Sequence, residues 1–262
     1  MPAETTTEQR FARALAFERG AHEQTAARVE ALRYGASLHD ASLPHVYWAN
    51  LLWVTARDGV GAAELVADAD RLLSGVPHRQ LVIEHETLWS TLDDELAGAG
   101  WERDAILYMT HERAPDRRPD VSAVREVGHD DLLTAEARAL RDEPNPDAPD
   151  ALRQVMHNNR RIGEYLGERC FAAYDGDMVC AYAKLRHRDD VAQIEDVAVL
   201  PGHRGRGLGR LVTSAALAEG LALEPELLFI VADEDDWPKE LYRRLGFEPA
   251  GRIRGYLRPP PS

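Results

Sequence analysis

The spacing of hydrophobic residues along this 262-residue chain switches repeatedly between a period of two and a period of three to four. Runs of strand type alternate with amphipathic runs of helix type, and polar turns separate them. The expected strands are 28–37, 45–54, 79–85, 101–110, 121–126, 168–174, 178–186, 191–200, 226–232 and a terminal pair from Phe247; the expected helices are 7–22, 61–74, 87–99, 129–140, 148–164, 207–219 and 237–245. This alternation predicts an α/β fold with a mixed central sheet flanked by helices.

An internal repeat divides the chain into two related units. A shift of 146 residues aligns Gly59–Val66 with Gly205–Val212 without a gap, and the same shift aligns Gly100 with Gly246. Three matches in one register, including Leu81–Glu84 over Leu227–Ile230, indicate a duplicated fold unit. The polar, proline-containing stretch Arg113–Asp120 suits a linker. We therefore expect one domain over 1–115 and a second over 116–262.

The second copy contains a glycine-rich, arginine-rich loop after an apolar strand, in the stretch Val197–Arg210. Glycines allow backbone N–H groups to converge on anionic oxygens, and the helix expected next directs its positive end to the same place. The first copy keeps the glycines but has Asp58 and Glu64 where the second has Arg204 and Arg210. The pattern predicts a phosphate-binding loop in the second unit only.

Two nucleotide-binding loops compete with this interpretation. A P-loop requires Gly-Lys followed by Ser or Thr, and this sequence has none. A dinucleotide-binding loop requires a third glycine where Arg210 stands, although Glu224 or Glu226 lies near the spacing of its ribose-binding acid. This loop also comes late in its domain rather than after the first strand, which disfavours the second alternative.

The loop Arg204-Gly-Arg-Gly-Leu-Gly209 and the downstream stretch Leu241-Tyr-Arg-Arg-Leu-Gly-Phe247 together resemble the GNAT superfamily of N-acetyltransferases. The resemblance covers residues 119–258 and implies acetyl-CoA as cosubstrate. Residues 1–112 share it only through the internal repeat, as in tandem-type members with one degenerate unit. The resemblance assigns cosubstrate binding to Val197, Ala198, Val199, Arg204, Gly205, Arg206, Gly207, Leu208, Gly209, Arg210 and Asp236.

Two catalytic candidates follow for an amine that attacks the thioester directly in a ternary complex. Tyr242 matches the family's tyrosine acid. Glu195 is the candidate base, and alternation along the strand is expected to place it on the face of Val197 and Val199, with Asp196 on the opposite face. Many members carry Asn where this chain has Asp236, which also suits a helix N-cap.

The amino-acid composition limits which ligands and partners the protein can bind. The net charge of −14 and the absence of a broad basic face exclude a nucleic-acid binder, and no apolar run is long enough to span a bilayer. The two cysteines suit small core residues, and the histidines show no metal-ligand spacing. We therefore expect a cytoplasmic protein without a metal, acting on a small-molecule or protein amine; a homodimer stays open.

The sequence thus favours an acyl-CoA-dependent N-acetyltransferase, with the first unit shaping the structure or the substrate site. A catalytically silent acyl-CoA-binding regulatory module is the alternative.

Overall fold

The computed structural model describes residues 5–140 and 149–260. The chain forms two compact units. The first residues of the chain belong to the C-terminal unit, and the last residues belong to the N-terminal unit. The C-terminal unit contains 1–14, 108–232 and 236–250, and the N-terminal unit contains 15–107, 233–235 and 251–262. The functional division into 1–115 and 116–262 stays a prediction.

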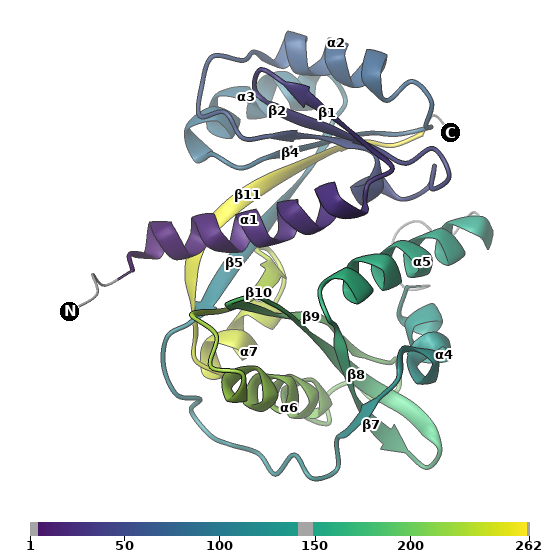
Figure 1. Ribbon diagram of the computed structural model, residues 1–262, viewed down its shortest axis with the longest axis vertical. Coiled ribbons are helices and arrows are strands. Elements are labelled where there is room, and N and C mark those ends of the chain that lie inside the picture. Colours follow the sequence, from purple (N-terminus) through teal and green to yellow (C-terminus); the bar gives the residue numbers. More distant parts are fainter. Residues whose placement is uncertain (1–4, 141–148, 261–262) are drawn as a thin grey trace. The chain divides into compact units, whose positions relative to one another are not determined.

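The C-terminal unit is a mixed sheet with helices on both faces (Figure 1). Its strands follow the order β5-β10-β9-β8-β7-β6. The elements are β5 (Glu102–His111), β6 (Arg125–Val127), α4 (His129–Ala139), α5 (Pro149–Tyr165), β7 (Arg169–Asp175), β8 (Met178–Arg188), β9 (Val191–Val199), α6 (Leu208–Ala222), β10 (Leu227–Asp233), α7 (Pro238–Arg244) and β11 (Phe247–Arg258).

Side chains alternate along β8 between the two faces of this sheet. Tyr182 packs with Leu132 and Ala135 of α4 in a buried cluster, while Leu185, one residue off that period, lies under Gly220 of α6. A Cβ atom on Gly220 would stand 3.2 Å from Leu185, so the absence of a side chain there lets α6 approach the sheet closely. The two faces are therefore covered by different helices, α4 and α6.

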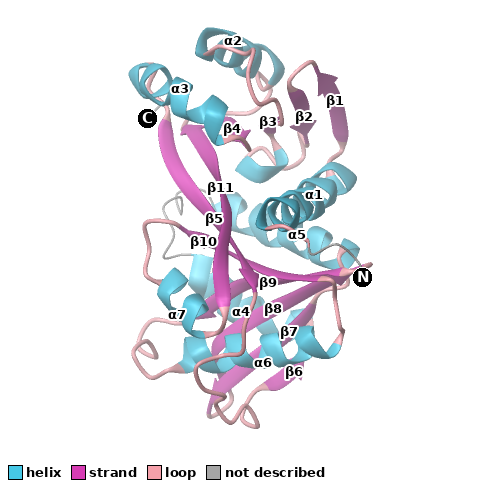
Figure 2. Cartoon of the chain, turned by 90° about the vertical axis from the view of Figure 1, so that its left-hand side faces the viewer, coloured by secondary structure: helices cyan, strands magenta, loops and turns pink. Residues whose placement is uncertain are grey.

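The N-terminal unit repeats this plan in shorter form. Its strand order is β1-β2-β3-β4-β11-β5, and its first four strands lie side by side in Figure 2. The elements are α1 (Thr7–Thr25), β1 (Arg28–Leu32), β2 (Gly35–His39), η1 (Tyr47–Ala49), β3 (Leu51–Val54), α2 (Ala62–Leu72), β4 (Arg79–Ile83) and α3 (Glu86–Gly98). α1, β5 and β11 each give one part to either unit. An apolar core joins α2 and α3 to one face of β3 and β4.

The repeat seen in the sequence is also present in the backbone. α2 begins 146 residues before α6, and Gly100 and Gly246 have positive φ angles of 82° and 98°. Gly246 also allows a close approach, because a Cβ atom there would stand 1.9 Å from the carbonyl oxygen of Arg113. The duplicated fold unit is therefore visible in the two units individually.

Four expectations about elements were wrong. Of the strand expected over 121–126, only the end is extended: Val121–Val124 form a turn, and β6 begins at Arg125. The strand expected over 28–37 is a hairpin of β1 and β2, with a turn at Arg33 and Tyr34. Within the strand expected over 45–54, Tyr47–Ala49 form a 3-10 turn, and only Leu51–Val54 (β3) are extended. The terminal strand pair expected from Phe247 is one long strand, β11, which pairs with β4 instead of folding back. The break between the helices expected over 129–140 and 148–164 lies outside the described residues.

Candidate active site

The glycine-rich loop is built as an anion cradle. Gly202, Gly205 and Gly207 all have φ angles near +80°, and Gly207 is the residue that starts α6. The backbone N–H groups of Gly205–Gly209 have no backbone acceptor among the described residues. A Cβ atom on Gly205 or Gly207 would meet nothing within 4 Å, so the space next to these N–H groups is open. The loop can therefore present several donors and a helix N-terminus to an anionic ligand.

A strand edge next to this loop is also unpaired. β9 and β10 are parallel partners from Val191↔Leu227 to Ile194↔Ile230, and their pairing ends there within the described chain. β9 continues to Val199 and stays paired antiparallel with β8, with a shift in register between Tyr182 and Lys184. The backbone of Val197–Val199 thus has one edge without a strand partner, which an extended ligand can use by adding hydrogen bonds as a strand would.

A β-bulge separates the two parts of β9. Lys184 pairs with Glu195, and Tyr182 pairs with Ala198. Between these two pairs, β9 therefore contains one residue more than β8. Asp196 within the bulge has a φ of 50°. The bulge overturns the expected alternation, because register partners share a face and Ala198, not Val197 or Val199, lies on the face of Glu195.

Asp196 also differs from its expected orientation. Its carboxylate lies 2.7 Å from Lys184 Nζ and accepts a hydrogen bond of 3.4 Å from Tyr182 Oη. Both partners lie on the Glu195 face, so Asp196 reaches that face rather than the opposite one. Val199 instead contacts the helix side, where its Cγ2 would stand 3.5 Å from a Cβ atom on Gly209.

The three loop arginines have different surroundings. Arg204 donates from Nε to the carbonyl oxygen of Val199 at 3.1 Å, and Arg206 lies 3.3 Å from a carboxylate oxygen of Asp175. Arg210 is largely buried and binds both carboxylate oxygens of Asp116, at 2.6 and 3.3 Å. The guanidinium of Arg210 is thereby neutralised within the protein, whereas its backbone N–H belongs to the first turn of α6.

Tyr242 lies in α7 and is buried, with its ring 6.5 Å from that of Phe247 in an edge-to-face arrangement. Its hydroxyl has no hydrogen-bond partner within the described part of the chain. Burial first, and then the negative charges of Glu195 and Asp236, raise the pKa of Tyr242. The phenol therefore stays protonated at neutral pH, as an acid must before it donates.

Glu195 lies opposite Lys184 on β9 and is partly buried. Gln193 Nε2 donates to its carboxylate at 2.9 Å, and Arg186 lies 3.7 Å away. Burial raises the pKa of Glu195 above its usual range, and the charge of Arg186 opposes that shift. A carboxylate with a raised pKa is a stronger base than an exposed one.

Asp236 does not cap α7 as the sequence suggested. The N-cap residue is Trp237, and Asp236 accepts a hydrogen bond of 2.7 Å from its backbone N–H. Pro238 occupies the first helical turn, as expected. The cosubstrate contact assigned to Asp236 stays a prediction.

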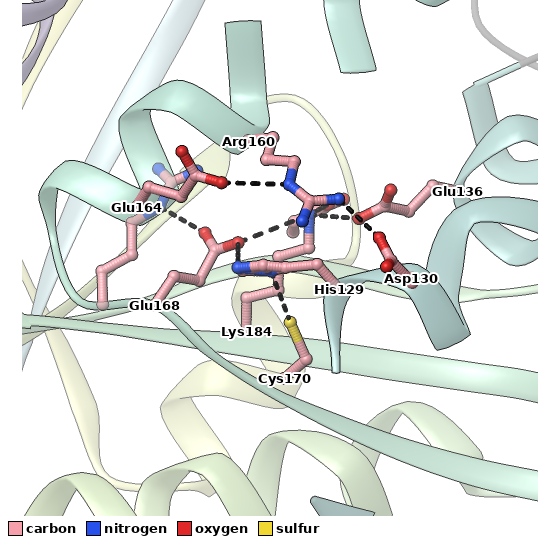
Figure 3. A network of polar contacts seen from close by, with 10 residues as sticks. His129, Asp130, Glu136, Arg160, Glu164, Glu168, Cys170 and Lys184 are labelled. Carbon is pink, nitrogen blue, oxygen red and sulfur yellow. Dashed lines mark hydrogen bonds and ion pairs between the residues drawn. The ribbon is translucent and has the colours of Figure 1, made fainter. Parts of the chain in front are cut away.

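A buried polar network under α4 and α5 was missed by the sequence analysis (Figure 3). At its centre, Glu168 is almost fully buried and lies 2.7 Å from Arg186, 3.8 Å from Lys184 and 3.9 Å from His129. His129 and Glu168 also come together with Cys170, and their ligand-type atoms lie within 4.8 Å of one another. Lys184 already supplies a cation beside this trio, and burial raises the pKa of Cys170 to about 12, so its thiol stays protonated.

The equivalent loop of the N-terminal unit lacks the open site. Arg33 forms an ion pair with Glu64 and donates to the carbonyl oxygen of Gly59 at 2.9 Å. β3 is paired with β4 as far as its last residue, Val54, so no strand edge comparable to Val197–Val199 opens beside this loop in the described chain. The cradle and the unpaired edge thus occur together in the C-terminal unit.

Comparison with known proteins agrees with this geometry. Residues 167–249 match the family model of the acetyltransferase (GNAT) domain, a range that holds β9, the loop, α6 and α7. The chain carries a GNAT domain. The resemblance inferred from the loop and from Tyr242–Phe247 is thereby confirmed for this part of the chain.

Solved structures share the fold over most of this chain. A GCN5-related N-acetyltransferase from Kribbella flavida is 18% identical with a TM-score of 0.59, covering 96% of this chain and 95% of that one. A conserved protein of unknown function from Staphylococcus epidermidis has a TM-score of 0.71 at 14% identity, covering 90% and 95%. A tandem GNAT protein from the clavulanic acid biosynthesis pathway has a TM-score of 0.52 at 18% identity, covering 76% and 70%.

These likenesses confirm the α/β class with its mixed sheet. Among curated proteins, no sequence matches this chain. Within the described residues, no helix combines the length and apolar character needed to cross a membrane.

Proposed function

We propose that the C-terminal unit transfers an acetyl group from acetyl-CoA to a primary amine, by direct attack of the amine within a ternary complex. The observation that carries the proposal is the unpaired edge of Val197–Val199 beside the N–H groups of Gly205–Gly209. An extended amide-bearing arm fits the strand edge, and a pyrophosphate fits the cradle. The GNAT match over 167–249 supports the same ligand class.

The chain's own groups suit the cosubstrate. Open space next to Gly205 and Gly207 leaves room for phosphate oxygens, and Arg204 and Arg206 add positive charge at the rim. Arg210 contributes its backbone N–H, because its side chain is engaged by Asp116. When bound, acetyl-CoA supplies an activated thioester carbonyl. The remaining chemistry is proton transfer, which the protein must provide.

Glu195 and Tyr242 divide that proton transfer. An amine is mostly protonated at neutral pH and must lose a proton before it attacks, and Glu195 accepts it directly or through water. Tyr242 donates a proton to the departing thiolate. Burial raises the pKa of both groups. Glu195 therefore needs a higher pH than an exposed glutamate to act as a base, and Tyr242 stays protonated at neutral pH and can act as an acid. Their opposite roles are therefore compatible with one working pH.

The N-terminal unit is proposed to shape the structure or the substrate site without binding acetyl-CoA. Arg33 engages Glu64 and Gly59 at the loop that corresponds to the cradle. The paired edge of β3 leaves no place for an added strand next to that loop.

Calorimetry with acetyl-CoA, followed by a thiol-release assay with a panel of polyamines, aminoglycosides and lysine peptides, tests this function. We expect saturable binding with one site per chain and thiol release with at least one amine class. Binding without thiol release for every amine would favour the catalytically silent acyl-CoA-binding module. A failure to bind acetyl-CoA would contradict both functions.

A further inference from the structure

Asp196 holds an unusual backbone conformation in the middle of a strand. Its φ of 50° lies in the left-handed region, which non-glycine residues rarely adopt and which Asp and Asn tolerate best. In this sheet, such a conformation otherwise occurs at Asp189, in the exposed turn between β8 and β9. A turn needs a positive φ, but a strand interior does not. The surroundings of Asp196 must therefore stabilise this conformation.

The side chain of Lys184 supplies that stabilisation. Its ammonium lies 2.7 Å from the Asp196 carboxylate and 2.5 Å from Glu136 of α4, and only 4% of the side chain is exposed. Tyr182 Oη donates to the other carboxylate oxygen of Asp196 at 3.4 Å. Lys184 thus ties the bulged residue of β9 to α4 across the face of the sheet.

The bulge lies at a decisive point of β9. Pairing with β10 ends at Ile194, two residues before Asp196, and the free edge of Val197–Val199 begins directly after it. A bulge bends its strand and increases the local twist. The conformation of Asp196 therefore sets the direction in which this edge leaves β10.

We propose that Lys184 and Asp196 are positioning residues, which form an ion pair that holds the β9 bulge and thereby aligns the free edge of Val197–Val199 for the acyl-CoA arm. This inference rests on the proposed function for its kinetic consequence, but not for its structural one. Neither residue needs to touch the reacting atoms. Loss of the pair raises the KM for acetyl-CoA and leaves kcat at saturation largely unchanged.

Variants of Asp196 separate backbone freedom from the ion pair. Asp196→Gly accepts the positive φ but removes the carboxylate, so we expect a rise of about tenfold in the KM for acetyl-CoA. Asp196→Asn keeps the tolerance for positive φ and an oxygen that accepts from Lys184 but loses the charge, so its KM should lie between those of the wild type and Asp196→Gly. Asp189→Gly is the matched control, with the same residue type and backbone conformation but no contact to Lys184, and it leaves KM unchanged.

A double variant tests Lys184 itself. If the ion pair acts as a unit, Asp196→Gly has no further effect on KM in a Lys184→Met background. Should Lys184→Met fail to fold because it strands buried carboxylates, the Asp196 series decides alone. A KM for Asp196→Gly within twofold of the wild type, or a further rise in KM when Asp196→Gly is added to Lys184→Met, overturns the proposal.

Hydrogen exchange provides a readout that does not depend on activity. In the ligand-free protein, Asp196→Gly should increase amide exchange over 195–199 at least about fivefold, while Asp189→Gly should not affect that segment. Unchanged exchange there overturns the positioning role. Absence of acetyl-CoA binding by the wild-type protein would instead contradict the proposed function and leave the exchange result to decide the positioning role.

Discussion

Arg210 and Asp116 form a two-pronged ion pair, with Nη1 and Nη2 lying 2.6 and 3.3 Å from the two carboxylate oxygens. The residue that corresponds to Arg210 in the N-terminal unit is Glu64, which Arg33 engages with two nitrogens. The same position in the two copies thus carries opposite charges, and each charge has its own partner. This arrangement assigns the Arg210 side chain a structural task in addition to any electrostatic one.

Replacement of Arg210 by Met should therefore cost more stability than cosubstrate affinity. Arg210 is largely buried and Asp116 is solvated, so removal of the guanidinium takes away a buried, charge-assisted contact and lowers stability. Denaturant unfolding of Arg210→Met should show a lower midpoint than the wild type, while calorimetry shows a change of at most about threefold in Kd for acetyl-CoA. A large loss of affinity with unchanged stability would assign the side chain to the phosphate instead.

Arg204 should behave in the opposite way. Its guanidinium lies at the rim of the cradle, where Arg204→Glu places a negative charge beside the expected pyrophosphate and should weaken acetyl-CoA binding by about tenfold or more. Asp58→Ala changes the corresponding position of the N-terminal unit and should leave Kd unchanged. The reverse result would move the binding site to the other unit.

The sequence predicted most helices and strands of this fold because their apolar faces are periodic and their ends carry turn residues. It failed over 28–37, where Arg33 and Tyr34 form a turn without the Asn-Gly or Asp-Gly signal of a tight hairpin. It also failed at Phe247, because one long strand and two short ones have the same pattern. Pairing of β11 with β4 is a long-range choice that no local pattern reveals.

The candidate site was predictable where it depends on glycine spacing and was not where it depends on tertiary contacts. The loop glycines have the positive φ angles that their spacing suggested. The bulge at Asp196 violates the period of two, so alternation assigned the wrong face to its neighbours. Lys184 lies 48 residues from Glu136 in the sequence, and no spacing rule links a buried lysine to carboxylates on other elements.

Tyr242→Phe isolates the proposed acid. Because the hydroxyl has no partner in the described chain, its removal should barely change stability or acetyl-CoA affinity. Loss of general acid catalysis should lower kcat by about a hundredfold. Tyr256→Phe is the control, since that hydroxyl donates to Asp93 in the N-terminal unit and its loss should affect stability rather than kcat. An unchanged kcat in Tyr242→Phe would remove this residue from the acid role.

The proposed base predicts the acid limb of the pH profile. Burial raises the pKa of Glu195, so the carboxylate becomes protonated at a higher pH than an exposed glutamate, and kcat/KM should fall as the pH drops through that raised value. Glu195→Gln should lower the rate and remove this limb. Amines of different basicity separate the enzyme from the acceptor, because a limb due to Glu195 keeps its position while one due to the amine moves. A limb that follows the amine pKa would contradict the assignment.

The buried side chain of His78 should make the N-terminal unit, and only that unit, less stable in mild acid. Its side chain is fully buried, Nε2 lies 3.1 Å from the carbonyl oxygen of Asn50, and burial lowers the pKa of His78 to about 4. The neutral form is favoured in the folded protein. Its contribution is therefore complete above the unfolded-state pKa near 6.5 and decreases as the pH falls toward 4, by up to about 3 kcal/mol.

Tryptophan fluorescence can follow this loss, because Trp48, Trp53, Trp89 and Trp101 lie in the N-terminal unit and Trp237 lies in the other. Urea unfolding should show that the free energy of unfolding of the wild type decreases as the pH is lowered from 7.5 to 4.5. The decrease should be smaller in His78→Gln, which cannot take up a proton at that position. An equal slope in both proteins would show that other groups control acid unfolding of this unit, and that the pKa of His78 does not differ between the folded and unfolded states.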